Sequence, residues 1–450
     1  MKRLKLSLAL LLGIGVYNGH AQTKLSLKET LQYALANNHK LAQTRMEEDL
    51  GRLKTAEIRA QALPQINANG NLTDNIIKPV FVLPGDALGQ PGKMLTVESG
   101  TTWNTGIGAD LSQQIFNQSV FTGLKAAKSG EEYYAMQTVQ SEENVIYQVS
   151  QMYYNLLVSQ ERMSVLQSNI DKLTKLVQTT QTQFENGLAK RIDLDRIKVN
   201  LVNYKTQKSQ LENQLRTQTN SLKSYLGMPL ETQLDLPAIE LSELANKASG
   251  NVDYGNFIVE NRTEFKLLKK QEELQNYQKK AYQAEYYPSL SLSANYSYNG
   301  ISDKFDIYKS GGTAFWYDMA SVALKLRIPI FDGYARRSKV NQANVTLRQI
   351  NRMQADTKLQ LNSAFENAKL NMANNLATIQ TQKENMQLAD EVYSTTQSNY
   401  NLGLANLTDL LNAETSLTEA QNSYNQALLE YKLAELELIK SNGNLKTLLN

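Results

Sequence analysis

Glycine and proline are distributed very unevenly in this chain, and their absence from long windows is the strongest constraint on its fold. Neither residue occurs in 131–186, 188–226, 334–402 or 404–442, and all eight prolines lie outside these windows. Interior glycine and proline weaken helices, whereas the Ala, Leu, Gln, Glu and Lys that are common in these windows favour them. The windows therefore predict four long helices, of which the longest would extend roughly 100 Å.

Apolar residues recur within these windows at alternating spacings of three and four. The clearest series are Val145, Val149, Met152, Leu156, Met163, Leu166, Ile170 and Leu173, then Leu194, Ile197, Leu201 and Tyr204, and finally Leu410, Leu417, Ala420, Tyr424, Ala427, Tyr431, Ala434 and Leu438. A sustained stripe of this kind predicts coiled-coil packing of the helices. Two shorter helices are expected at 41–63 and 265–287.

Four short segments show a period of two instead. Apolar and polar residues alternate in 65–73, 105–112, 289–299 and 320–330. This is the pattern of a strand, and about ten residues span a bilayer when the strand is tilted. The residues expected against lipid are Ile66, Leu72, Leu292, Tyr296, Leu324 and Ile328. The residues expected on the water-filled side of a barrel include Asn67, Asn69, Asp110, Ser293, Lys325 and Arg327.

Aromatic residues gather at the ends of these segments. They are Trp103, Phe116, Tyr286, Tyr287, Trp316, Tyr317 and Phe331. Transmembrane β-barrels carry aromatic girdles at both membrane interfaces, so we interpret the segments as barrel strands, with a soluble half-buried sheet as the alternative. Four strands are too few for a barrel, because the smallest have about eight, so two or three copies of the chain must contribute.

The N-terminus has the form of a secretory signal peptide over residues 1–21. Lys2, Arg3 and Lys5 precede an apolar stretch, and a small-residue cleavage site ends at Ala21. Without these residues the formal charge of +3 falls to zero, which leaves no electrostatic footprint for nucleic acid. The chain has no cysteine, so disulfides and thiolate metal sites are excluded. No later stretch is long and apolar enough to predict a transmembrane helix.

The chain repeats itself. Phe184, Gly187, Leu188 and Ala189, followed by Asp193 and Leu194, recur at one constant offset as Tyr400, Gly403, Leu404, Ala405, Asp409 and Leu410. Pro64 recurs as Pro288, and Ile115-Phe116-Asn117 recurs as Ile330-Phe331-Asp332. The duplication predicts two structural repeats. The first covers 22–250, with strands near 65–74 and 103–116 and a turn near 187. The second covers 251–450, with strands near 288–299 and 317–331 and a turn near 403, and residues 227–260 connect the two.

Catalytic and metal sites find no support in the sequence. The only histidines are His20, in the signal segment, and His39, so a His-based triad or metal cluster cannot be built in the mature chain. Gly92-Lys93 lacks the remainder of a phosphate-binding loop. We expect no catalytic residue, no metal and no cofactor.

The paired turns with a following Asp, the strand-entry prolines and the Ile-Phe-Asn/Asp strand exits resemble the TolC family of outer-membrane factors over nearly all of 22–450. The resemblance implies a mixed α and β membrane protein whose duplicated unit forms, as a homotrimer, a 12-stranded transmembrane β-barrel in outer-membrane lipid and a long periplasmic α-helical barrel of coiled-coil type. The strand count allows either two or three copies of the chain in one barrel, and the resemblance to this family implies three.

The same resemblance implies roles for residues at the turns. Asp409 would form a ring at the periplasmic entrance, and Asp193 would latch to Tyr400. Ala405 replaces an Arg of the family's latch, and Asn412 stands where a second Asp is frequent. The turn residues expected at the tip and in contact with an adaptor are Phe184, Gly187, Leu188, Gly403 and Leu404.

These observations predict an outer-membrane channel subunit of a tripartite efflux or type I secretion system. It would be a passive exit duct, gated at its periplasmic tip, that binds a periplasmic adaptor protein and an inner-membrane pump, directly or through the adaptor. The alternatives are a periplasmic adaptor, which needs helical hairpins but no amphipathic strands, and a structural coiled-coil protein of the cell envelope.

Overall fold

The computed structural model describes residues 23–84, 89, 92–237, 257–309 and 311–449. The expected signal peptide at 1–21 and most of the connection at 227–260 lie outside these residues. The chain divides into two compact units, one formed by Met1–Gln43, Val139–Thr263 and Lys358–Asn450, the other by Thr44–Thr138 and Glu264–Thr357. Among the helices of the described chain, none combines the length and apolar character needed to cross a membrane.

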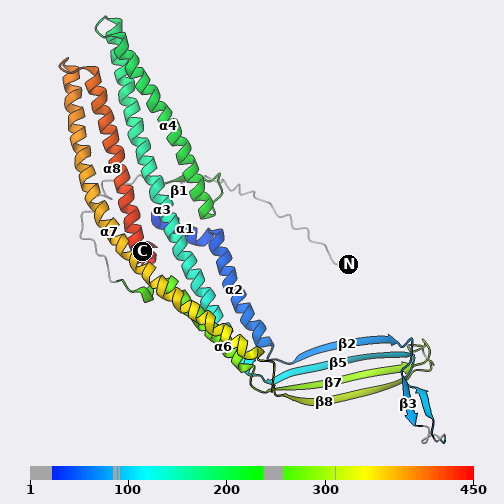
Figure 1. The fold of residues 1–450 in the computed structure, drawn as a ribbon. Coiled ribbons are helices and arrows are strands. Elements are labelled where there is room, and N and C mark those ends of the chain that lie inside the picture. The colour runs from blue at the N-terminus through cyan, green and yellow to red at the C-terminus, as the bar shows by residue number, and fades with distance from the viewer. Residues whose placement is uncertain (1–22, 85–88, 90–91, 238–256, 310, 450) are drawn as a thin grey trace, which may run out of the picture. The chain divides into compact units, whose positions relative to one another are not determined.

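The first unit is built from two helical hairpins (Figure 1). Helix α3 (Gln118–Glu185) turns back into α4 (Arg191–Leu226), and α7 (Ala335–Asn401) turns back into α8 (Leu407–Ser441). The long helices α3 and α7 begin in the second unit and end in the first. Smaller elements complete the unit: α1 (Leu27–Asn37), the 3₁₀ helices η2 (Val259–Asn261) and η3 (Leu445–Leu449), and the parallel pair β1 (Thr23–Lys24) and β6 (Leu234–Asp235).

The heptad stripes pack as the spacing predicts. On α8 the stripe from Leu410 to Leu438 is buried, and its C-terminal part forms a core with Phe365, Met372 and Ile379 of α7. On α3, Val145, Val149 and Leu156 form a second core with α1 and with the end of α4. The heptad stripes therefore pack α8 against α7, and they pack α3 against α1 and the end of α4.

Helix α1 was not predicted, although its start carries a clear signal. Ser26 and Glu29 form a capping box, in which the Glu29 carboxylate accepts from the Ser26 amide at 2.8 Å. At its other end Asn38 donates to the Tyr225 carbonyl at the end of α4. Gly227 follows α4 with φ of 72°, and a Cβ there would lie 2.3 Å from the Asn37 carbonyl. Only glycine fits this close approach.

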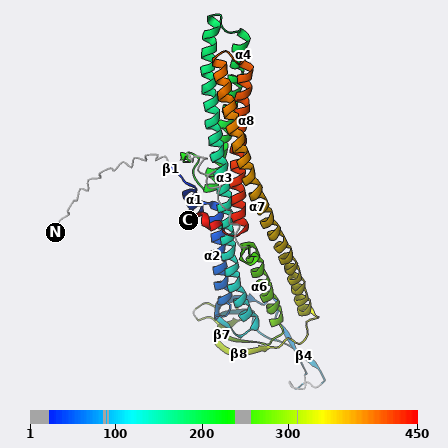
Figure 2. The same ribbon diagram turned by 90° about the vertical axis from the view of Figure 1, so that its left-hand side faces the viewer.

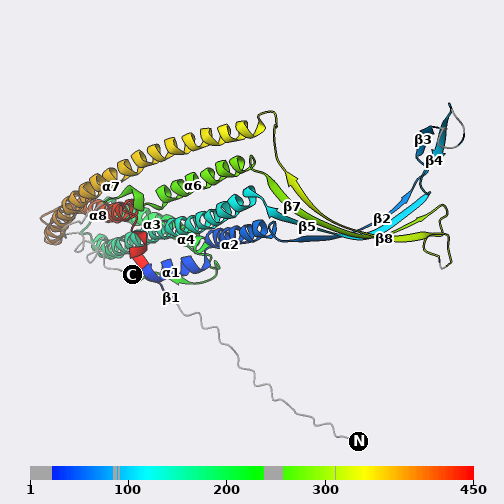
Figure 3. The same ribbon diagram turned by 90° about the horizontal axis from the view of Figure 1, so that it is seen from below.

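The second unit contains α2 (His39–Ala60), which starts in the first unit, α6 (Thr263–Ala284), and a four-stranded antiparallel sheet of order β2-β5-β7-β8 (Figure 3). The strands are β2 (Gln65–Asp74), β5 (Trp103–Phe116), β7 (Ser289–Ser302) and β8 (Phe315–Arg327). They lie where the alternation predicts them, except that β8 ends at Arg327. Ile328, expected against lipid within this strand, therefore lies beyond it, because Pro329 lacks the amide that a continuing strand requires.

Register aligns the two faces across all four strands. One rung joins Ile66, Leu111, Ala294 and Val322, and the next joins Asn67, Asp110, Asn295 and Ser321. Cross-strand partners share a face, so one face of the whole sheet is mainly apolar and the other mainly polar. Strands β2 and β8 form the two edges, and neither has an outer partner within the described chain.

Helix α3 begins at Gln118, eleven residues before the expected start at 129. Gly123 and Gly130 lie inside it, since a glycine weakens a helix by only about 1 kcal/mol relative to alanine. The true start is marked by Asn117, whose side chain accepts from the Ser119 amide at 3.0 Å. Asp332 likewise accepts from the Arg336 amide at 2.9 Å at the start of α7. The repeated Ile-Phe-Asn/Asp motif is thus a helix cap.

Candidate functional site at the hairpin tips

The two hairpin turns have the same backbone structure. Gly187 and Gly403 both have φ of 74°. The Leu188 amide donates to the Gln183 carbonyl at 2.7 Å, and the Leu404 amide donates to the Asn399 carbonyl at 2.8 Å. Both turns are therefore Schellman motifs, in which glycine supplies the left-handed conformation. They lie at the same end of the helical unit (Figures 1 and 2). Leu188 and Leu404 are 81% and 76% exposed.

The two aspartates that follow the turns have different surroundings. Asp409 is exposed and belongs to a capping box, accepting from the Asn406 amide at 3.4 Å while Asn406 accepts from the Asp409 amide at 2.9 Å. Asp193 holds the equivalent position in α4, but Lys190 stands where Asn406 stands and cannot cap. Within the described chain the Asp193 carboxylate makes no hydrogen bond. The structure thus gives Asp409 a helix-capping role that sequence reasoning missed.

A cavity of 860 Å³ lies between the two hairpins next to the turns. Asp193 and Tyr400 both line it, whereas Asp409 does not. Tyr400 is half-buried and packs against the apolar clusters that join the hairpins. The cavity is also lined by three cationic side chains, those of Lys172, Lys175 and Lys190. The structure therefore brings Asp193 and Tyr400 to one cavity, with no hydrogen bond between them in the single chain.

Helix α8 carries a second stripe, displaced from the first. It has the same three-four spacing but is largely polar: Leu407, Leu411, Glu414, Thr418, Gln421, Asn425, Leu428 and Lys432. Thr418 accepts from Asn169 of α3 at 2.8 Å and from the Tyr204 hydroxyl of α4 at 3.3 Å. A side-chain oxygen of Gln421 and the side-chain nitrogen of Asn425 are buried without a partner in the described chain. The contact between the hairpins is consequently only partly satisfied, which lowers its stability.

Glu414 is the most unusual residue of this stripe. Its side chain is 4% exposed, and its Oε1 atom has no hydrogen-bond partner among the described residues. Burial raises the pKa of Glu414 to about 7, although nearby Lys172 acts in the opposite direction. Burial raises the pKa of Tyr204 of α4 and of Tyr393 of α7, and the nearby Glu414 carboxylate acts in the same direction. The sequence signal for this residue is the second stripe on α8, to which the apolar stripe from Leu410 to Leu438 gives no clue.

The polar face of the sheet carries the other predicted site residues. Asp110 accepts hydrogen bonds from Asn69 on β2 and Asn295 on β7. Lys325 and Arg327 share this face, opposite Ser291 and Ser289 respectively. The face therefore combines one hydrogen-bonded carboxylate with two cations further along the sheet.

The chain matches the family model described as outer membrane efflux protein over residues 30–228 and 258–444. The chain belongs to this family. Nodulation protein T of Rhizobium leguminosarum bv. trifolii is 25% identical over 272 residues, a match that spans 60% of this chain and 57% of that protein. The probable efflux pump outer membrane protein TtgC of Pseudomonas putida KT2440 is 21% identical over 431 residues, covering 93% of this chain and 83% of TtgC. Among solved structures, the outer membrane protein VceC of Vibrio cholerae superposes with a TM-score of 0.73 at 16% identity, covering 93% and 96% of the two chains.

Family membership makes this chain an efflux channel subunit of the outer membrane with a large periplasmic portion, as the sequence predicts. The helical hairpins and the four-stranded sheet have the fold of the outer-membrane channels. Neither a periplasmic adaptor nor a structural coiled-coil protein agrees with this match.

Proposed function

We propose that three copies of this chain close into one exit duct, whose barrel crosses the outer membrane and whose helical tip gates the periplasmic entrance. The observation that carries the proposal is the four-stranded sheet with one apolar face, one polar face and two unpaired edges. Unpaired backbone groups in lipid each cost several kcal/mol, so the edges require partners. Edge β8 of one copy pairs with edge β2 of the next, antiparallel like every other pair in the sheet.

In this duct the polar face lines the water-filled passage. The apolar rung from Ile66 to Val322 faces lipid, and the rung with Asp110 faces the lumen. Lys325 and Arg327 add positive charge to the lumen wall near one end of the barrel. The charged and amide groups of this face let hydrated solutes pass without contact with lipid.

The gate is formed by the turns and the helix starts behind them. Three copies of exposed Asp409 around a narrow axis repel one another and bind cations. Asp193 and Tyr400 line the cavity between the hairpins, and a hydrogen bond between their side chains in the closed assembly would hold neighbouring hairpins together. The partly unsatisfied stripe on α8 supports this proposal, because a weak contact between hairpins is the one that can slide when the tip opens.

The tip is also the docking surface for a periplasmic adaptor that links the duct to an inner-membrane pump. Leu188 and Leu404 place apolar side chains in water beside Gly187 and Gly403, and Phe184 is half-buried behind them. Exposed apolar residues at the end of a polar helical surface are typical of a protein contact. The proposal involves no catalytic step and no cofactor.

The mass of the purified full-length protein in mild detergent tests the assembly. We expect a particle of three chains, and a mass of one or two chains would refute the trimer.

Because the chain has no cysteine, single substitutions test the two faces cleanly. A Lys325→Cys variant should react with a membrane-impermeant thiol reagent, whereas the matched Leu324→Cys variant on the opposite face should be protected. The reverse pattern would overturn the assignment of the lumen.

A further inference from the structure

A separate β-hairpin extends from the loop end of the sheet (Figure 3). It consists of β3 (Val80–Pro84) and β4 (Met94–Glu98), which pair with each other and with no other strand of the described residues. The sequence did not predict it, because each strand has five residues, 80–83 is a continuous apolar run, and the alternation in 95–98 covers four residues. An isolated two-stranded hairpin is only marginally stable in water, so its apolar residues are expected to pack against something else.

Register separates the two faces of this hairpin. Phe81 is opposite Val97, and Leu83 is opposite Leu95, so these four apolar side chains share one face. The other face is mixed, since Val80 is opposite Glu98, Val82 is opposite Thr96 and Pro84 is opposite Met94. Phe81, Leu83 and Val97 are 61%, 42% and 41% exposed and Leu95 is half-buried, so the described chain leaves most of this face uncovered. We name the four residues Phe81, Leu83, Leu95 and Val97 the apolar hairpin face.

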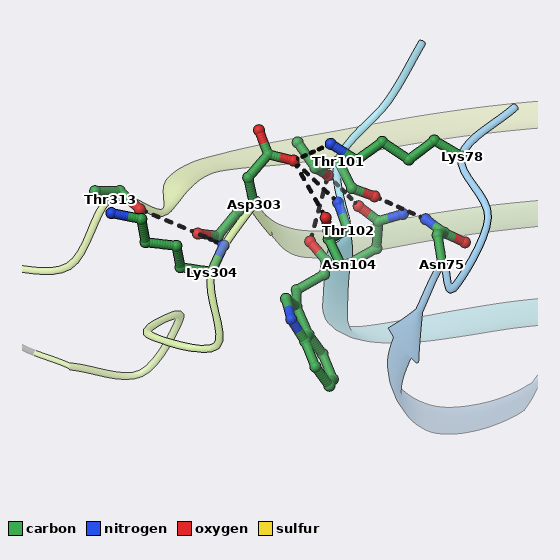
Figure 4. A network of polar contacts seen from close by, with 10 residues as sticks. Asn75, Lys78, Thr101, Thr102, Asn104, Asp303, Lys304 and Thr313 are labelled. Atoms are coloured by element: carbon green, nitrogen blue, oxygen red, sulfur yellow. Dashed lines mark hydrogen bonds and ion pairs between the residues drawn. The ribbon is translucent and has the colours of Figure 1, made fainter. Parts of the chain in front are cut away.

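The base of the hairpin is held in place by a polar network (Figure 4). Lys78 pairs with Asp303 in the loop after β7 at 2.6 Å, and Asp303 also accepts from the Thr102 amide at 3.2 Å. Asn75 donates to the Thr101 carbonyl at 2.8 Å. The Asp303 contacts join both sides of the hairpin base to the β7–β8 loop, and the Asn75 contact joins the two sides to each other. The apolar hairpin face is therefore presented from a fixed base.

Topology determines what lies near this face in an assembly. Asp74 at the end of β2 pairs with Trp103, Trp103 pairs with Ser302, and Phe315 at the start of β8 pairs with Ile301. All hairpins and β7–β8 loops therefore lie at the same end of a closed barrel. The β7–β8 segment of each copy presents exposed aromatic rings there, those of Phe305, Tyr308 and Phe315.

Lipid is disfavoured as the cover for this face. Trp103 and Trp316 lie at the loop end of the strands, and aromatic residues at a strand end mark where a barrel leaves the hydrocarbon layer. The hairpin starts beyond that end, on the water side, where an exposed apolar face favours a contact with protein. We propose that the apolar hairpin face packs against the loops at the same end of a neighbouring copy of this chain, so that the hairpins link the subunits outside the membrane. This inference rests on the multi-subunit barrel proposed above.

Site-specific photocrosslinking tests the contact in the full-length protein in its native membrane. A benzophenone amino acid replaces Phe81 on the apolar hairpin face or, as the matched control, Val82 on the mixed face. We expect irradiation of the Phe81 variant to produce a covalent two-chain species, with the second chain joined within 75–98 or 302–317. The Val82 variant should give at least five-fold less.

Crosslinks from Phe81 to lipid or only within its own chain, or equal yields from the two faces, would overturn the inference. A second measurement does not depend on the probe: Phe81→Ser should lower the temperature at which the assembled particle dissociates, and Val82→Ser should leave it unchanged. Equal dissociation temperatures for these two variants would also overturn the inference. A three-chain particle without the crosslink refutes only the hairpin contact, whereas a one-chain particle refutes the proposed function itself.

Discussion

Neutralising Glu414 is expected to remove a pH dependence from the tip of the helical unit. Burial raises the pKa of this carboxyl from 4.5 to about 7. Because the folded state favours the protonated form, the stabilisation is complete below about pH 4.5 and is lost as the pH rises through about 7. Each pKa unit corresponds to about 1.4 kcal/mol, so the contact between the hairpins should weaken by up to about 3 kcal/mol over this range.

The charges around Glu414 do not reverse this sign. Lys172 of α3 favours the ionised form, but burial dominates. Tyr204 and Tyr393 face Glu414 from α4 and α7, and burial raises the pKa of each, so both stay neutral over this range. Ionised Glu414 is therefore a buried charge without a hydrogen-bonded cation, and the hairpins should separate more often above pH 7.

Hydrogen–deuterium exchange of α8 peptides covering 407–420, corrected for the intrinsic rate, measures this opening directly. Protection in the wild type should fall by up to about a hundredfold between pH 5 and pH 7.5. Glu414→Gln mimics the protonated form and should keep its protection over the same range. Glu419→Gln, which alters an exposed carboxyl on the same helix, should behave like the wild type. Parallel pH profiles for the wild type and Glu414→Gln would refute the reasoning.

Three further perturbations are expected to have distinct effects. Leu324→Arg on the apolar face should destabilise the folded barrel by up to roughly 2–4 kcal/mol, as measured by denaturation in detergent micelles or lipid, whereas Lys325→Leu should change stability much less; equal effects would contradict the faces. Asp409→Asn should reduce divalent-cation block in single-channel recordings, while Asp193→Asn should raise the open probability; wild-type behaviour of both variants would leave the turns without a gate. Gly227→Ala should lower stability by about 1–3 kcal/mol in thermal unfolding, because alanine must adopt a left-handed backbone against the Asn37 carbonyl; an unchanged melting temperature would exclude this strain.

The regular parts of the fold could be predicted from the sequence, because their periodicities are long. The stripe on α8 from Leu410 to Leu438 and the alternation from Ser289 to Asn299 each repeat often enough to identify one element type. The start of α7 at Ala335 agrees with the window that begins at 334, whereas α3 starts at Gln118, eleven residues before the expected position, because Gly123 and Gly130 lie inside the helix. The β3–β4 hairpin has five residues per strand, and the apolar run in β3 and the four-residue alternation in β4 are too short to identify the element type.

The candidate site was only partly predictable. Asp193 and Asp409 can be identified from the sequence because they hold equivalent positions in the two repeats. The residues three positions earlier differ, however, and Lys190 and Asn406 give the two carboxylates different environments. Glu414 occupies a buried position on a stripe that also contains Leu407 and Leu411. Its burial depends on α3 and α4, which are distant in the sequence, so the pattern of α8 alone could not establish it.

Ion conduction by the purified full-length protein tests the central claim most directly. The protein is reconstituted from detergent into planar bilayers, and currents are recorded under voltage. A trimeric water-filled duct predicts discrete current steps of uniform size. Divalent cations added to the side of the helical tip should block these steps, and cations added to the opposite side should block them less. Insertion of three-chain particles that carry no current at any voltage would contradict a channel function.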